Sequence, residues 1–75
     1  DIRIFDVTKS DKEFVWHRDD KTRQIEILEG EGWQFQRENN LPFLLKRGMI
    51  FEIEKESYHR LVKGITDLKI KIINK

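Results

Sequence analysis

The sequence predicts an all-β protein whose short antiparallel strands form a small barrel or sandwich. Its apolar residues are mostly β-branched or aromatic, with ten Ile, five Phe, three Val and no Ala, a composition that favours strands. Apolar and polar residues alternate with period two in several runs, most clearly in Leu68-Lys69-Ile70-Lys71-Ile72, as strands with one buried face require. Turn-forming residues such as Gly30-Glu31-Gly32 separate these runs at short intervals, which is typical of barrels and sandwiches.

The alternating runs and the turns between them define the expected elements. Strands are predicted, with ends good to about two residues, over residues 2–7, 13–18, 23–29, 32–37, 43–46, 49–53, 58–63 and 67–73. One competing interpretation concerns the second strand, because Asp11 to Trp16 also fits a single helical turn. No repeat or linker interrupts the pattern, so residues 1–75 are expected to form one domain.

Length, charge and cysteine content exclude several classes of protein. The 75 residues carry 15 Lys and Arg against 14 Asp and Glu, a formal net charge of +1, so the strongly basic field that attracts nucleic acids is absent. Without cysteine the chain forms no disulfide and no thiolate zinc site. No apolar run reaches the ~20 residues that cross a bilayer. We therefore expect a cytoplasmic protein without nucleic-acid or membrane partners and, because so small a core stabilises weakly, a homodimer.

Only two histidines occur, His17 and His59. In a strand, His17 and Asp19 point to the same side, so two potential ligands share one face. The spacing here resembles the first motif of the cupin superfamily, G-x5-H-x-H followed by E three or four residues later and then x6-G. The run His17-x-Asp19-x3-Arg23-x6-Gly30 keeps these intervals, but Asp19 stands where the family has its second His and Arg23 where it has Glu.

The surroundings of His59 resemble the second cupin motif, G-x5-P-x-G-x2-H-x3-N. The run Gly48-x5-Glu54-x-Glu56-x2-His59 keeps the intervals as far as the histidine, with Glu54 and Glu56 in place of Pro and Gly. The two motifs cover residues 17–59. The resemblance implies a small antiparallel cupin-like β-barrel of the double-stranded β-helix, or jelly-roll, type, with metal ligands at both histidine positions.

Three interpretations of this site are open. In the first, His17, Asp19 and His59 bind a divalent ion such as Fe, Mn, Ni or Zn and leave coordination positions free. In the second, Arg23 pairs with Asp19 and no metal binds, because a buried guanidinium demands an anionic partner. In the third, both histidines are hydrogen-bonded core residues. A metal bound in the first arrangement needs an anionic molecule near Arg23, since the ligands supply only one negative charge.

Strand phase determines what else lines the pocket. The cupin pattern implies that Gln34 and Gln36 face inward with Arg23 and orient a polar or anionic ligand, while Trp33 and Phe35 face outward. An outward aromatic stripe often marks an interface, so the homodimer is expected to form through Trp33 and Phe35. Hydrophobicity alone fits the opposite phase equally well, with both aromatic rings in the core and both glutamines in solvent.

The leading functional hypothesis is a small-molecule-binding cupin with a metal site at His17, Asp19 and His59. The alternative is a metal-free binding or dimeric interaction module that the pair Asp19–Arg23 holds together. The cupin fold hosts enzymes of several classes as well as storage and sensor proteins, so the resemblance names no reaction or substrate.

Overall fold

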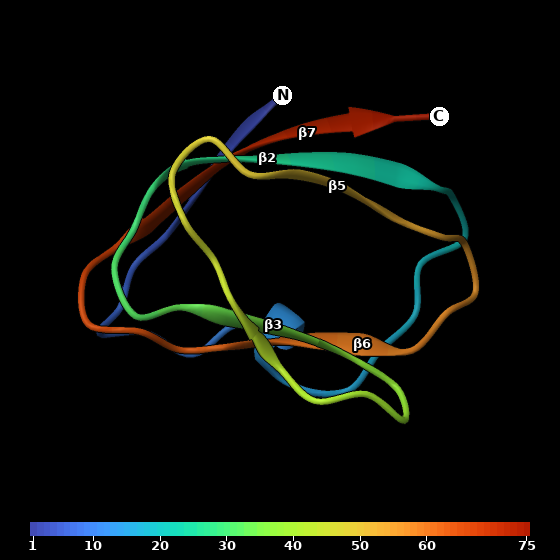
Figure 1. The fold of residues 1–75 in the computed structure, drawn as a ribbon, viewed down its shortest axis with the longest axis horizontal. Helices are drawn as coiled ribbons and strands as arrows, with labels where there is room; N and C mark the ends of the chain where they lie inside the picture. The colour runs from blue at the N-terminus through green and yellow to red at the C-terminus, as the bar shows by residue number, and fades with distance from the viewer.

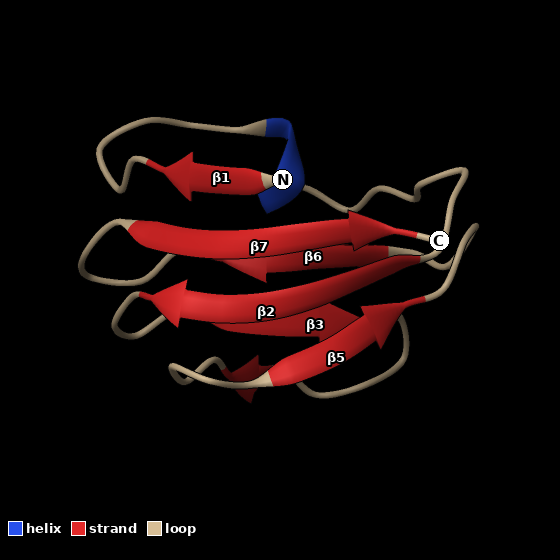
Figure 2. Ribbon diagram, turned by 90° about the horizontal axis from the view of Figure 1, so that it is seen from above, coloured by secondary structure: helices blue, strands red, loops and turns tan.

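The computed structural model describes all 75 residues and is built almost entirely from strands. In chain order the elements are β1 (Ile2–Phe5), the 3-10 turn η1 (Lys12–Phe14), β2 (Arg23–Glu29), β3 (Gln34–Arg37), β4 (Phe43–Leu44), β5 (Ile50–Ile53), β6 (His59–Val62) and β7 (Leu68–Asn74). The strands form two antiparallel sheets that face each other (Figure 1), in the orders β1-β7-β2-β5 and β4-β3-β6. Figure 2 shows the four-stranded sheet in front of β3 and β6. The all-β prediction is confirmed, but the ladders remain two sheets and do not close into one barrel.

The core lies between the sheets and consists of nine buried apolar residues, Phe5, Ile25, Ile27, Trp33, Phe35, Leu45, Ile53, Leu68 and Ile70. Trp33 is fully buried, and its Nε1–H donates a hydrogen bond to the carbonyl of Thr66 at 2.5 Å. Phe14 of η1 packs against Trp33 with 5.5 Å between ring centroids. The turn η1 is therefore held against the core.

The strand predicted over 13–18 is wrong. Asp11 caps η1 instead, and its Oδ1 accepts a hydrogen bond from the backbone N–H of Glu13 at 2.9 Å, which satisfies a donor that a helix start leaves free. The chain leaves this turn extended at Val15 and makes only one bridge to another strand, at His17. The competing interpretation, a single helical turn, is the one that the structure contains.

The inward phase predicted for Gln34 and Gln36 is also wrong. Trp33 and Phe35 are 0% and 2% exposed, whereas Gln36 lies on the outer side of β3, where its Oε1 accepts a hydrogen bond from Arg60 at 3.0 Å. Burying a large apolar side chain contributes about 1.5–3 kcal/mol, and so small a core gains more from two aromatic rings than from a polar lining. Trp33 and Phe35 cannot form a dimer interface, and the homodimer itself stays a prediction.

The turn between β6 and β7 approaches Trp33 very closely. A Cβ placed at Gly64 would lie 2.3 Å from the carbonyl oxygen of Glu31 and 2.5 Å from the backbone nitrogen of Trp33. The neighbouring N–H of Ile65 donates to the same Glu31 carbonyl at 2.8 Å. Only glycine leaves room for this contact, which holds the turn beneath the core tryptophan.

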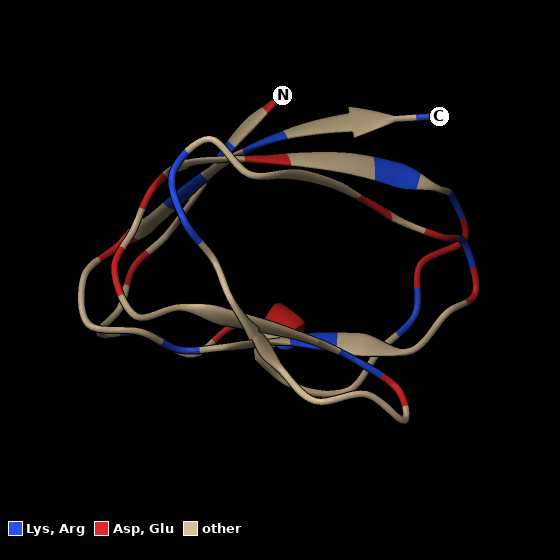
Figure 3. Cartoon of the chain, viewed as in Figure 1, with Lys and Arg blue, Asp and Glu red and all other residues tan.

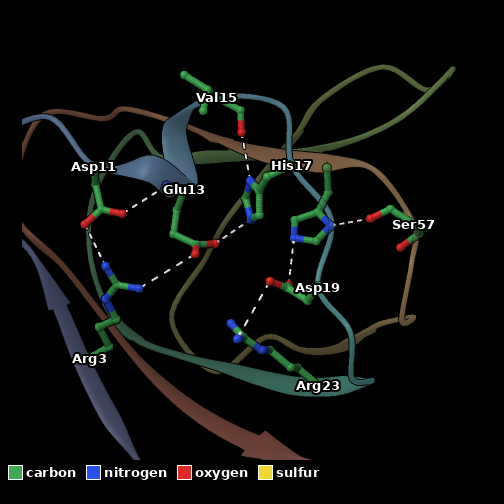
Figure 4. Close-up of polar contacts among 9 residues, drawn as sticks. Arg3, Asp11, Glu13, Val15, His17, Asp19, Arg23 and Ser57 are labelled. Atoms are coloured by element: carbon green, nitrogen blue, oxygen red, sulfur yellow. Dashed lines mark hydrogen bonds and ion pairs between the residues drawn. The ribbon is translucent and has the colours of Figure 1, made fainter.

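Charged residues of both signs are distributed along strands and turns (Figure 3), in keeping with the net charge of +1. No helix in the structure has the length and hydrophobicity needed to span a membrane. Five charged side chains, by contrast, lie close together near the start of β6 (Figure 4). They are Arg3, Asp11, Glu13, Asp19 and Arg23.

Candidate metal centre

The backbone brings the two histidines side by side. The N–H of His17 donates to the carbonyl of His59 at 3.1 Å, and the N–H of His59 donates to the carbonyl of His17 at 2.9 Å. Directly opposed residues of an antiparallel pair put their side chains on the same face, and here the imidazole centroids lie 4.4 Å apart. His59 is 2% exposed, while His17 is partly exposed.

Backbone carbonyls fix the orientation of both rings. The Nδ1 of His17 lies 2.8 Å from the carbonyl oxygen of Val15, and the Nδ1 of His59 lies 2.8 Å from that of Ser57 (Figure 4). Because a carbonyl oxygen only accepts hydrogen bonds, we assign the proton of each neutral ring to Nδ1 and the lone pair to Nε2. Metal-binding histidines are commonly held in this way, with the non-ligating nitrogen donating to a carbonyl or carboxylate.

Glu13, which the sequence analysis missed, completes the histidine pair. Its Oε1 lies 2.7 Å from Nε2 of His17, and one ligand atom from each of Glu13, His17 and His59 lies within 4.8 Å of the other two. Glu13 is 8% exposed, so its carboxylate faces the histidines rather than solvent. These three side chains are close enough to hold a metal ion. The available signal was the position of Glu13 in the competing helical turn over residues 11–16, since a continuous strand would separate Glu13 from His17 by about 13 Å.

Asp19, the carboxylate that the sequence predicted as a ligand, lies between His59 and Arg23. Its Oδ2 is 3.2 Å from Nε2 of His59, and its Oδ1 is 3.7 Å from Nη2 of Arg23. The contact with His59 does not form a hydrogen bond, and the contact with Arg23 is too long to be one. Four atoms are buried here without a hydrogen-bond partner in the protein, namely Asp19 Oδ2, Arg23 Nε and Nε2 of His17 and of His59. Buried polar atoms are nearly always paired, so these four atoms have room for a partner from outside the chain, such as water or an ion.

At each histidine Nε2 lies close to a carboxylate oxygen, at 2.7 Å for His17 and 3.2 Å for His59, and two acceptor atoms at such distances repel each other unless a positive charge lies between them. A proton is one such charge. Burial, however, lowers the pKa of His59 more than its hydrogen bond to Ser57 and the nearby carboxylates Asp19 and Glu13 raise it, so its ring is neutral near pH 7. A metal cation between these groups would satisfy the nitrogen and oxygen atoms together.

A second arginine supports Glu13 from the side away from the histidines. Arg3 of β1 contacts Asp11 Oδ2 at 2.6 Å and Glu13 Oε2 at 3.8 Å. Glu13 thus lies between a histidine and an arginine, as Asp19 does (Figure 4). Contacts of this kind orient ligating side chains in metal sites.

A cavity of about 30 Å³ lies between the sheets next to His59. Its polar end is formed by Arg3, Glu13, Asp19, Arg23 and His59, and its other walls are apolar. Of the residues predicted to bind a ligand, Arg23 lines this cavity and Gln34 and Gln36 do not.

The reverse side of the histidine bridge carries two pairs of an aromatic ring and an arginine. Arg60 lies 4.9 Å from the ring centroid of Trp16, and Arg18 lies 5.5 Å from that of Tyr58. Trp16 and Tyr58 are 44% and 40% exposed. Since each ring belongs to the neighbour of a histidine, chain alternation turns it away from the face that carries both imidazoles.

Comparisons with models of known protein families, with curated proteins and with solved structures found no match.

Proposed function

We propose that this protein is a small divalent-metal-binding module of the cupin type, which also binds a small polar or anionic molecule beside the metal. His17 and His59 provide nitrogen ligands through Nε2, and Glu13 provides an oxygen ligand. The observation that carries the proposal is the pair of Nε2 atoms, both buried, both unpaired and both within reach of the same carboxylate.

The donor set fits a first-row transition metal. Imidazole nitrogen suits Zn, Fe, Ni and related ions, and two histidines with one carboxylate leave coordination positions free for another molecule. Calcium and magnesium prefer sites made of oxygen ligands and fit less well. A bound ion of this kind would supply Lewis acidity at the polar end of the cavity.

The strand order supports the cupin resemblance. Counting the bridge at His17 as a minimal strand gives eight strands in chain order, and the two sheets then read first-eighth-third-sixth and second-seventh-fourth-fifth. This interleaving of two four-stranded sheets is the arrangement of a jelly roll, the architecture to which cupins belong.

The backbone at two motif positions gives further support. Glu56 stands where the second cupin motif has glycine, and its φ of 63° lies in the left-handed region that glycine favours. Gly48, which opens the same motif, has φ 90°. The chain thus adopts a conformation that glycine favours at a position where the resemblance implies glycine.

A metal-free binding module is the second candidate, and the contact between Asp19 and Arg23 favours it. At 3.7 Å this ion pair would hold the start of β2 to the segment before it without a metal ion. It does not involve Nε2 of His17, which lies 2.7 Å from Oε1 of Glu13 in either candidate.

Metal content distinguishes the two candidates. The protein is purified without chelators or a histidine tag, its metals are measured by elemental analysis, and the apo protein is titrated with Zn(II), Fe(II), Mn(II), Ni(II) and Co(II) in a calorimeter. We expect one ion per chain, which is lost in His17→Ala and Glu13→Gln. Glu31→Gln, the control, neutralises an exposed carboxylate outside the site and keeps the metal.

His17 is the better histidine to replace because it is partly exposed, whereas His59 is part of the packed interior. Circular dichroism establishes that each variant is folded. A folded native chain that binds none of the five ions contradicts the metal centre and leaves the metal-free module.

A further inference from the structure

Arg23 has unused hydrogen-bonding capacity next to the metal centre. It is the first residue of β2 and lines the cavity between the sheets. Its Nε is buried without a partner, and its contact with Asp19 is 3.7 Å long, whereas charge-assisted hydrogen bonds span about 2.7–2.9 Å. A guanidinium presents five N–H donors in a planar fork, so Arg23 can bind a second anion.

The charge of the cluster sets the charge of that anion. The ionised groups are two guanidiniums and three carboxylates, those of Arg3, Arg23, Asp11, Glu13 and Asp19. With both imidazoles neutral, as metal ligation requires, the net charge is −1, and a divalent ion changes it to +1. Because uncompensated charge is costly in a poorly solvated cavity, a monoanion is favoured over a neutral or doubly charged molecule.

The cavity limits the size of the anion. Its volume of about 30 Å³ equals about two to three water-sized positions, since one requires roughly 10–15 Å³. Beyond the polar end its walls are apolar and include Phe35, Leu61 and Ile72. A ligand of about three heavy atoms fits this space, and a carboxylate that carries an aromatic ring does not.

We propose that the cavity binds a monoanion of the size of formate or azide beside Asp19, where the guanidinium of Arg23 holds it within reach of the metal ion. The inference rests on the proposed metal centre. The unpaired Nε2 of His59, which is 2% exposed, marks the metal side of the cavity, and the unpaired Nε of Arg23 marks the anion side.

Cobalt(II) makes the two proposals separately testable because its visible absorption responds to changes in its ligands. The apo protein is first titrated with Co(II), and the Co(II) protein is then titrated with sodium azide, sodium formate and sodium benzoate. We expect saturable spectral changes with azide and formate and none with benzoate. Failure to bind Co(II) overturns both proposals, whereas Co(II) binding without a response to azide or formate overturns the anion site alone.

Variants of Arg23 identify the binding residue. Arg23→Gln is expected to keep Co(II) and to weaken azide and formate binding about tenfold or more, because it removes charge-assisted hydrogen bonds. Arg47→Gln is the control, since Arg47 is exposed and forms no ion pair, and it should change neither affinity.

Arg23→Lys keeps the charge but lacks the planar fork, and it is expected to weaken azide less than Arg23→Gln does. It also serves as the test variant where Arg23→Gln does not fold. Unchanged azide affinity in a folded Arg23 variant overturns the inference, as does benzoate binding as tightly as formate.

Discussion

Glu13 Oε1 lies 2.7 Å from Nε2 of His17, four residues further along a segment whose sequence pattern predicted a strand. Asp19, the predicted carboxylate ligand, contacts only His59 of the two histidines. The 3-10 turn therefore brings a second acidic residue to the histidines. Glu13 approaches His17 from the preceding segment, while Asp19 lies between His59 and Arg23.

Replacing each carboxylate by its amide tests this assignment. Glu13→Gln removes the proposed oxygen ligand, and we expect it to weaken Zn(II) binding more than Asp19→Asn does. Asp19→Asn changes a supporting contact of His59, for which losses of about 10–100-fold are usual. Calorimetric titration gives both affinities. A larger loss in Asp19→Asn would restore Asp19 as the metal ligand.

The stability of the metal-free protein should fall on mild acidification. Burial lowers the pKa of His59 in the folded chain below its ordinary value of 6.5, so as the pH falls below about 6.5 the unfolded chain takes up a proton before the folded chain does. The free energy of unfolding then decreases, by at most about 1.4 kcal/mol per pH unit for one group. Urea unfolding in EDTA at a series of pH values measures this slope.

The slope should be smaller in a folded His59→Gln variant, because that variant cannot titrate at this position. An equal slope in the variant and the native chain would assign the effect to another group.

The contact of Gly64 beneath Trp33 predicts a marked sensitivity to a single methyl group. Gly64→Ala should destabilise the fold by about 3 kcal/mol, because its Cβ meets backbone atoms that cannot move without shifting the turn. The control is Gly48→Ala, whose Cβ meets nothing within 4 Å and which should cost about 1 kcal/mol for its left-handed backbone alone. Thermal and urea unfolding rank the two variants, and the reverse order would contradict the close packing.

At position 56 we expect the opposite effect, with glycine more stable than a residue that has a Cβ. Its φ of 63° is strained for a residue with a Cβ, so Glu56→Gly should be more stable than Glu56→Ala by about 0.5–1 kcal/mol. Both variants lose the same exposed ion pair with Arg18, so that loss cancels in the comparison. Equal stabilities in urea would show that this turn has no strain to relieve.

The elements that the sequence predicted best are those with long alternating runs. The expected strand over 23–29 coincides with β2, and the expected strand over 67–73 differs from β7 by one residue at each end. The phase of residues 33–36 could not be decided in this way, because period-two alternation fits either phase. Burial of Trp33 and Phe35 decides it, and it depends on how few large apolar residues the whole chain can place in its core.

The histidines of the site were predictable, and their environment was not. Both were singled out by scarcity and motif spacing, and the structure brings them together through a backbone bridge. Glu13 was not predicted because η1 spans only three residues, and a segment this short shows no helical periodicity in the sequence. The carbonyls of Val15 and Ser57 that orient the rings are positioned by tertiary structure, and side-chain spacing carries no information about them.

The two tryptophans occupy opposite environments, and this gives the protein two optical reporters. Trp33 is sealed in the core, whereas Trp16 is exposed beside His17 under the guanidinium of Arg60. Emission from Trp33 should be shielded from iodide and should change only when the core opens. Emission from Trp16 should be quenched by iodide and should respond when His17 is restrained by a ligand on the other side of its backbone. Fluorescence measured with and without iodide would thus separate the emission of the two tryptophans, so that unfolding and site occupancy are reported independently.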